Sequence, residues 1–175
     1  MDDRLQALLD KQEIYEVLAR YLRAVDRGDL DGVAACYLPG ATEDHGGVFA
    51  GSATDYVAGI ARVLTHPRSR TMHAMTNVLI ELDGDSAVAE SYVTTYSRVK
   101  TPGGPGASFV GARIVDRLER RDGRWGIAHR ALVWEWSHDA PAAETWIFGM
   151  LVPDPDTLAR GRKFPDDIVY TGGAQ

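Results

Sequence analysis

The chain has 175 residues, of which 45% are hydrophobic, enough for one compact domain with a buried core. Its 25 acidic and 19 basic residues give a net charge of −6, and without a basic run this argues against a nucleic-acid partner. The single cysteine, Cys36, excludes an internal disulfide and indicates a reducing compartment. No apolar stretch approaches the ~20 residues of a membrane span, so we expect a cytoplasmic protein that does not bind membranes.

The N-terminal part is predicted to be helical. Asp2 or Asp3 can cap a first helix that runs to about Asp26, and Gly28 suits the left-handed turn at its end. Asp29 is positioned to cap a second, shorter helix.

Turn signals then divide the next segment. Pro39-Gly40 ends the second helix, and residues 41–50 predict a small hairpin with His45 near its turn. A third helix is expected behind Ser52 or Thr54, until His66-Pro67 ends it.

After Pro67 the hydrophobic pattern changes from helical to alternating, which predicts strands. Tight-turn signals at residues 83–85 and 122–123 predict two antiparallel hairpins, and the glycine-rich residues 101–107 predict a longer loop between them. Helices followed by a meander indicate an α+β fold, with the helices packed on one face of a strongly bent, mainly antiparallel sheet. The expected strands cover residues 71–82, 86–99, 108–121 and 124–136.

Residues 1–136 are therefore predicted to form the domain, and residues 137–175 a C-terminal arm with four prolines and little periodicity. The apolar run at 146–152 is too hydrophobic to be left in water, so we expect the arm to cover a pocket or a subunit interface.

Asp26 and His73 are the first candidates for chemistry. Asp26 lies at the edge of the apolar face of its helix, where a carboxylate needs a partner or has a task. A carboxylate bonded to one imidazole nitrogen would leave the other nitrogen as a general base. The alternatives are a structural histidine and a surface pairing of Asp26 with Arg23 or Arg27.

Alternation assigns the faces of two strands. His73, Met75, Asn77 and Leu79 would share one face, and Met72, Val78, Ile80 and Leu82 the other. In the last strand Gly126, Ala128, Arg130, Leu132, Trp134 and Trp136 would share a face, opposite Trp125, Ile127, His129, Ala131 and Val133.

Arg130 lies beside small residues and near Trp134, which suits an anion or a polarised oxygen, although pairing with Asp116 or Glu135 is an equal alternative. Arg113 and Asp116 face opposite ways by alternation, so one of them is expected on the pocket side.

The sequence contains no glycine-rich phosphate loop, no nucleophile elbow and no His/Cys spacing typical of a metal site. We therefore expect proton-transfer chemistry without a metal or another cofactor.

Three stretches resemble the SnoaL-like branch of the nuclear transport factor 2-like fold, a cone-shaped α+β barrel: RYLRAVDRGDLDGV, TMHAMTNVLIEL and DRLERRDGRWGIAHRALVWEW. The chain looks most like the lyases of this branch, namely hexachlorocyclohexane dehydrochlorinase, scytalone dehydratase and the bile-acid dehydratases. The resemblance implies a catalytic His73–Asp26 dyad and a homo-oligomer, with a trimer favoured over a dimer.

By the same resemblance Arg130 matches an arginine of the dehydrochlorinase, and Tyr21 stands where that enzyme has lysine and the bile-acid enzymes have tyrosine. This favours loss of water over dehalogenation. The expected function is a cofactor-independent lyase of the dehydratase type, acting on a small hydrophobic, cyclic or aromatic molecule, with Tyr21, Arg130, Arg113 and Trp134 as substrate-binding residues. An isomerase or polyketide cyclase using the same base, and a non-catalytic ligand-binding protein, are the alternatives.

Overall fold

A computed structural model describes residues 2–67, 69–142, 146, 149–154 and 156–172. Its helices are α1 (Asp3–Arg27), α2 (Leu30–Cys36), α3 (Ala53–Leu64) and the short α4 (Ile168–Thr171). Its strands are β1 (Tyr37–Asp44), β2 (Ala50–Ser52), β3 (Arg70–Asp83), β4 (Ser86–Thr101), β5 (Gly104–Arg121) and β6 (Arg124–Pro141). None of the helices in this part of the chain is long and apolar enough to cross a membrane.

Most helix boundaries follow the predicted signals, but α2 ends at Cys36 and Pro39-Gly40 lies inside β1, so the prediction that this pair ends the helix is wrong. Asp2 caps α1 by accepting a hydrogen bond from the Arg4 backbone N–H, and Asp29 caps α2 in the same way through Gly32. At the other end of α1, Gly28 has a φ of 67° and its N–H bonds back to the helix. This left-handed turn ends the helix just after Asp26.

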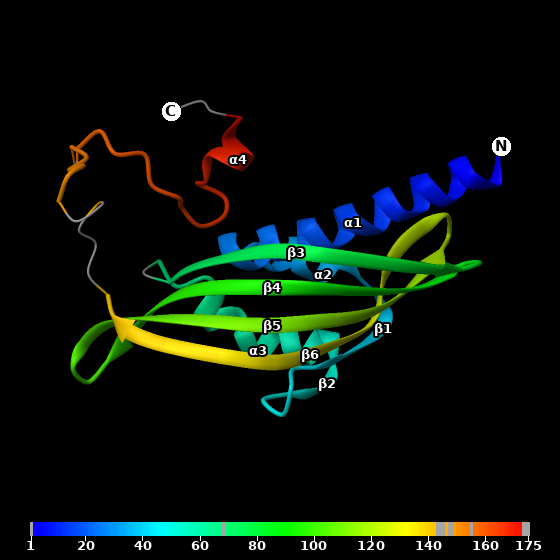
Figure 1. The fold of residues 1–175 in the computed structure, drawn as a ribbon, viewed down its shortest axis with the longest axis horizontal. Coiled ribbons are helices and arrows are strands. Elements are labelled where there is room, and N and C mark those ends of the chain that lie inside the picture. Colours follow the sequence, from blue (N-terminus) through cyan, green and yellow to red (C-terminus); the bar gives the residue numbers. More distant parts are fainter. Residues whose placement is uncertain (1, 68, 143–145, 147–148, 155, 173–175) are drawn as a thin grey trace.

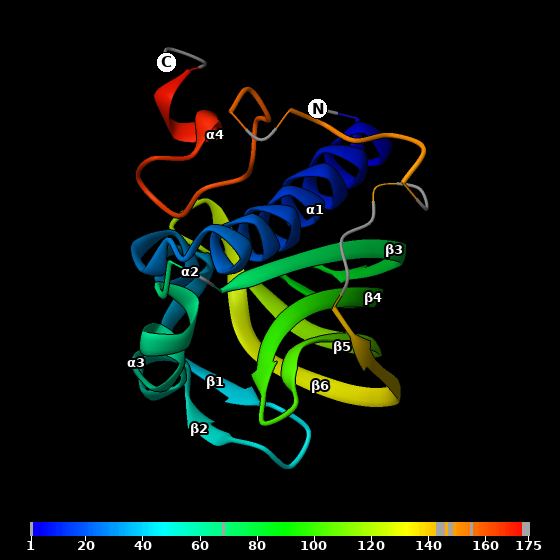
Figure 2. The ribbon, with the colours of Figure 1, turned by 90° about the vertical axis from the view of Figure 1, so that its left-hand side faces the viewer.

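The sheet has six strands in the order β2-β1-β6-β5-β4-β3, and every pairing is antiparallel except that of β1 with β6. It bends strongly without closing into a barrel (Figures 1 and 2). In Figure 2, α1 lies along the side of β3 and α3 lies near β1 and β2. The α+β class and the predicted β1–β2 hairpin are thus confirmed.

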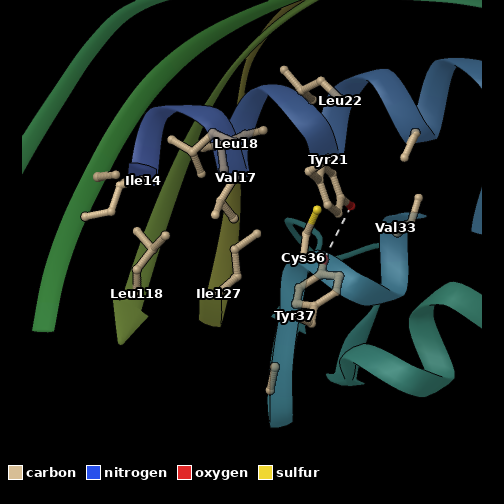
Figure 3. Packing of buried hydrophobic residues seen from close by; sticks show 14 of the residues in the cluster. Ile14, Val17, Leu18, Tyr21, Leu22, Val33, Cys36, Tyr37, Leu118 and Ile127 are labelled. Atoms are coloured by element: carbon tan, nitrogen blue, oxygen red, sulfur yellow. Dashed lines mark hydrogen bonds between the residues drawn. The ribbon is translucent and has the colours of Figure 1, made fainter. Parts of the chain in front are cut away.

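The core fills one end of the space between sheet and helices. Ile14, Val17 and Leu18 of α1 face Leu118 of β5 and Ile127 of β6 (Figure 3), and all five side chains are buried. Burying each such side chain contributes roughly 1.5–3 kcal/mol. One turn further along α1, Tyr21 marks the border between this packed end and a hollow end.

Three β-bulges correct the predicted strand faces, one in β3 and two in β6. The bulge at Glu135 of β6 puts Trp134 and Trp136 on opposite faces. In β3 the register with β4 shifts between Thr76 and Leu79, and Asn77 there has a φ of 50°. Beyond the bulge Ile80 is buried in the core and Leu79 is exposed. Val78 and Leu82 also pack against the core, so they lie on the face that alternation alone assigned to His73.

The same happens in β6. Arg117 pairs with His129 but Leu118 pairs with Ile127, so Ala128 is the extra residue. As a result Ile127 and Arg130, predicted on opposite faces, are both buried on the helix side of the sheet. The bulge also brings Trp125 into the core.

The turn between β4 and β5 is much shorter than the loop predicted at residues 101–107. Thr101 pairs with Gly104, and the ladder continues to Ser86 opposite Glu119, so only Pro102 and Gly103 remain in the turn. The glycines and Pro105 fit here because the strands extend past the body of the sheet (Figure 1).

The C-terminal arm docks on the end of α1. Lys163 Nζ donates to the backbone oxygen of Asp26 (2.9 Å), and the Phe164 N–H donates to that of Arg27 (2.7 Å). These carbonyls have no partner within the helix, so the arm satisfies them. Of the apolar run, Ile147 and Phe148 lie outside the described residues, while Met150 to Val152 are exposed. A covering role for the arm stays a prediction.

Candidate active site

A cavity of about 360 Å³ occupies the hollow end of the molecule, between α1, α3 and the bent sheet. Most of its wall is apolar, and the polar side chains that reach it come from six different elements. The apolar wall includes Leu22, Val25, Ile60, Leu64, Val93, Ile114 and Leu132, and the polar or aromatic groups include Tyr21, Glu43, His45, Tyr56, Thr71, His73, Arg130 and Trp134.

Asp26 and His73 meet at the edge of this cavity. Asp26 Oδ1 lies 2.6 Å from His73 Nδ1, and Asp26 Oδ2 accepts the backbone N–H of His73 at 3.0 Å. The carboxylate therefore fixes both the ring and the strand that carries it, leaving Nε2 as the ring nitrogen available to a ligand. The side chains are only 11% and 18% exposed. The structure thus joins the two residues whose pairing the sequence predicted.

Both alternative partners of Asp26 make other contacts. Arg27 forms an ion pair with Asp167 of the arm at 3.3 Å, and the guanidinium of Arg23 lies over the ring of Tyr170.

Arg130 lies on the opposite wall and forms a buried, two-point ion pair with Asp116, at 2.7 and 2.8 Å. Burial disfavours the charged guanidinium, but Asp116 more than compensates and holds the pKa of Arg130 well above its ordinary value. Of the two partners left open, Asp116 is the one observed. The Nη1 atom has no hydrogen-bond partner among the described residues, and the guanidinium lies 3.8 Å from the centre of the Tyr21 ring.

Three buried tyrosines surround this arginine. The hydroxyls of Tyr21 and Tyr37 are 3.3 Å apart (Figure 3), and Tyr37 donates to Glu43 at 2.5 Å. Burial raises the pKa of Tyr21, of Tyr37 and of Tyr56. All three therefore remain neutral phenols near pH 7, and each hydroxyl can donate one hydrogen bond.

Glu43 and His45 were not predicted as site residues. Glu43 is 1% exposed, and its Oε1 lies 3.0 Å from Nδ1 of His45, whose ring lines the cavity. The signal was available, because alternation along β1 places residues 43 and 45 on the same face. It was obscured by the position of His45 beside the turn of a small hairpin.

The other two predicted binding residues differ in position. Trp134 lines the mouth of the cavity, 46% exposed, with its ring edge-on to His45. Arg113 lies outside the cavity, because it bonds Glu90 (2.8 Å) and Glu135 (2.6 Å) on the other face of the sheet. The prediction that Arg113 binds substrate is therefore wrong for this cavity, and Asp116 is the one on the pocket side.

A metal site is not evident in the part of the chain that the structure describes, where no three His, Cys, Asp or Glu side chains gather in a suitable group. The polar groups of the cavity instead form two histidine–carboxylate pairs, one arginine–carboxylate pair and a set of phenols. Such a set can move protons and stabilise negative charge on oxygen.

The bent α+β cone is the fold of the nuclear transport factor 2-like class. Residues 6–131 match the SnoaL-like domain, and the chain belongs to this family. No curated protein matches the sequence.

Solved structures share the fold at low identity. A candidate scytalone dehydratase from Novosphingobium aromaticivorans is 20% identical, with a TM-score of 0.69, over 82% of this chain and 94% of that one. A type 3 hexachlorocyclohexane dehydrochlorinase from Novosphingobium barchaimii is 17% identical, with a TM-score of 0.71, over 86% and 99%. A protein of unknown function from Mycobacterium tuberculosis is 28% identical, with a TM-score of 0.58, over 74% of each chain.

Proposed function

We propose that the protein is a cofactor-independent lyase of the dehydratase type, which removes water from a small, hydrophobic cyclic or aromatic molecule. The observation that carries this proposal is the Asp26–His73 pair, whose 2.6 Å contact holds an imidazole at the wall of an apolar cavity.

In the proposed reaction Nε2 of His73 removes a proton from a carbon next to a carbonyl. Asp26 holds the ring by Nδ1 and stabilises the imidazolium that forms. The second contact, from Asp26 to the backbone of His73, supports this role because it prevents the pair from turning away from the cavity.

Negative charge then develops on the carbonyl oxygen, and Arg130 is suited to receive it. Its Nη1 atom is buried without a hydrogen bond to any described residue, a state that costs free energy unless a ligand provides the acceptor. Tyr21 lies against the same guanidinium and offers a neutral phenol. We assign both to the oxyanion.

The shape and lining of the cavity support the substrate class. Its volume of about 360 Å³ lies in the range of small-molecule sites, and aliphatic side chains form most of its wall. The dehydratase and dehydrochlorinase names among the proteins of similar fold are consistent with an elimination.

The test compares wild type with His73→Ala on a panel of cyclic hydroxy-ketones and aromatic polyols, measuring product formation and the ligand-dependent shift of Tm. We expect dehydration by the wild type and a loss of about 100-fold or more in the variant, as for removal of a general base. A circular-dichroism melt of His73→Ala confirms that it is folded.

Equal turnover by both proteins would rule out His73 as the base. A shifted double bond without loss of water would identify an isomerase. Thermal stabilisation of both proteins without any product would identify a ligand-binding protein, in which the Asp26–His73 pair is structural.

A further inference from the structure

A second histidine–carboxylate pair lines the same cavity. His45 follows the end of β1, and its Nδ1 lies 3.0 Å from Glu43, which is fully buried and also accepts the Tyr37 hydroxyl. The two residues flanking the imidazole are aromatic: Tyr56 stacks on it with ring centres 5.0 Å apart, and Trp134 stands edge-on at 5.8 Å.

This arrangement is a built site. Glu43 holds one ring nitrogen, and the aromatic rings fix the plane of the imidazole, so Nε2 is the nitrogen that a molecule in the cavity can reach. A carboxylate bonded to Nδ1 stabilises the imidazolium once the ring has taken up a proton, and Nε2 can then pass that proton to a molecule in the cavity. Neither Glu43 nor His45 takes part in the abstraction assigned to His73.

We propose that His45 is the general acid of the reaction, and that the substrate is a compact β-hydroxy ketone that spans the two imidazoles. This inference rests on the proposed function, since it assigns the second proton of the same elimination.

The step balances without a co-reactant. His73 takes the proton from the carbon next to the carbonyl, and the electron pair of that C–H bond forms the C=C bond. The C–O bond to the β-hydroxyl breaks while Nε2 of His45 gives its proton to the departing oxygen, which leaves as water. His73 ends protonated and His45 neutral, and exchange with solvent restores both.

A general acid matters only when the leaving group needs a proton, and this allows a sharp test. 3-Hydroxycyclohexanone and 3-acetoxycyclohexanone give the same enone, but acetate leaves without being protonated. The variant is His45→Asn, whose amide can keep the hydrogen bond to Glu43 and has no group that can donate a catalytic proton. His73→Ala is measured beside it.

We expect His45→Asn to lose about 100-fold or more on the hydroxy ketone and less than about threefold on the acetoxy ketone. His73→Ala should lose both activities. Retained acetoxy turnover also shows that the His45→Asn protein is folded and that its base is intact. Glu43→Gln should behave like His45→Asn and lose activity selectively on the hydroxy ketone. The reason is that Glu43 orients the imidazole of His45 and stabilises its protonated form.

An equal loss on both ketones, or no loss on either, would overturn the role of His45 and leave the proposed lyase standing. Wild-type protein that converts neither ketone would contradict the elimination itself, and the role of His45 with it.

Discussion

At the scale of single residues, Asp116 and Arg130 form the most buried ion pair described, with side-chain exposures of 0% and 3%. Replacing Asp116 with Asn leaves the guanidinium charged and without its counter-ion. Breaking a buried pair from one side costs about 3–5 kcal/mol, so we expect Asp116→Asn to lower the free energy of unfolding by this amount, measured by urea denaturation.

The matched control is Glu135→Gln, which makes the same change in an ion pair that water reaches. Glu135 pairs with Arg113, and the side chains are 44% and 34% exposed. Exposed pairs contribute about 0–1 kcal/mol, so this variant should unfold almost as the wild type does. Equal losses in the two variants would show that burial of Arg130 does not matter to stability.

At the scale of elements, the end of α1 depends on Gly28. Its φ of 67° disfavours any side chain, and a Cβ there would lie 2.6 Å from the backbone oxygen of Leu64. Gly28→Ala should therefore destabilise by more than the ~1–2 kcal/mol of a left-handed residue, and activity should fall because Asp26 lies two residues away. Thermal unfolding and turnover measure the two effects.

Gly47 is a control that measures the cost of backbone strain without the cost of steric crowding. It has a φ of 86°, but no heavy atom lies within 4 Å of a Cβ built on it. Gly47→Ala should carry only the ~1–2 kcal/mol of backbone strain. If Gly28→Ala is no more destabilised than Gly47→Ala, the contact between the end of α1 and α3 is not tight.

The elements also show how far the sequence predicts this molecule. Gly28 marks the end of the helix that carries Asp26, and the alternation from Thr71 marks the strand that carries His73. The pairing of the two residues was predicted from the resemblance to the SnoaL-like lyases. No feature of the sequence predicts the bulge at Ala128, because alanine fits a regular strand equally well. Each unmarked bulge reverses the faces beyond it, which is why the environment of Arg130 required the structure.

At the scale of the whole molecule, Asp167 ties the C-terminal arm to α1. Burial would raise its pKa, but the backbone N–H groups of Arg162 and Val169, together with Arg27, hold the pKa below its ordinary value of 3.8. A carboxyl whose pKa is lower in the folded state stabilises that state above its unfolded pKa, and this contribution is lost as the pH falls through the folded pKa.

We therefore expect Asp167→Asn to lower stability by about 1.5–3 kcal/mol at pH 7, the range for hydrogen bonds to a charged group. The difference in Tm from wild type should shrink below about pH 4. Asp166→Asn, at an exposed neighbouring position, should match the wild type throughout. A difference between wild type and Asp167→Asn that is unchanged at low pH would contradict the ionised carboxylate.

Assembly as a trimer stays a prediction, which sedimentation can test.

The central claim is that His73, held by Asp26, removes a proton from carbon in the cavity. The most direct measurement is proton NMR of deuterium uptake next to the carbonyl of cyclohexanone in D₂O, because this ketone has no leaving group and reports on the base alone. We predict exchange above the buffer rate with wild type, at least about 100-fold slower exchange with His73→Ala, and an intermediate rate with Asp26→Asn. Exchange at the buffer rate with wild type, or at the wild-type rate with His73→Ala, would contradict the claim.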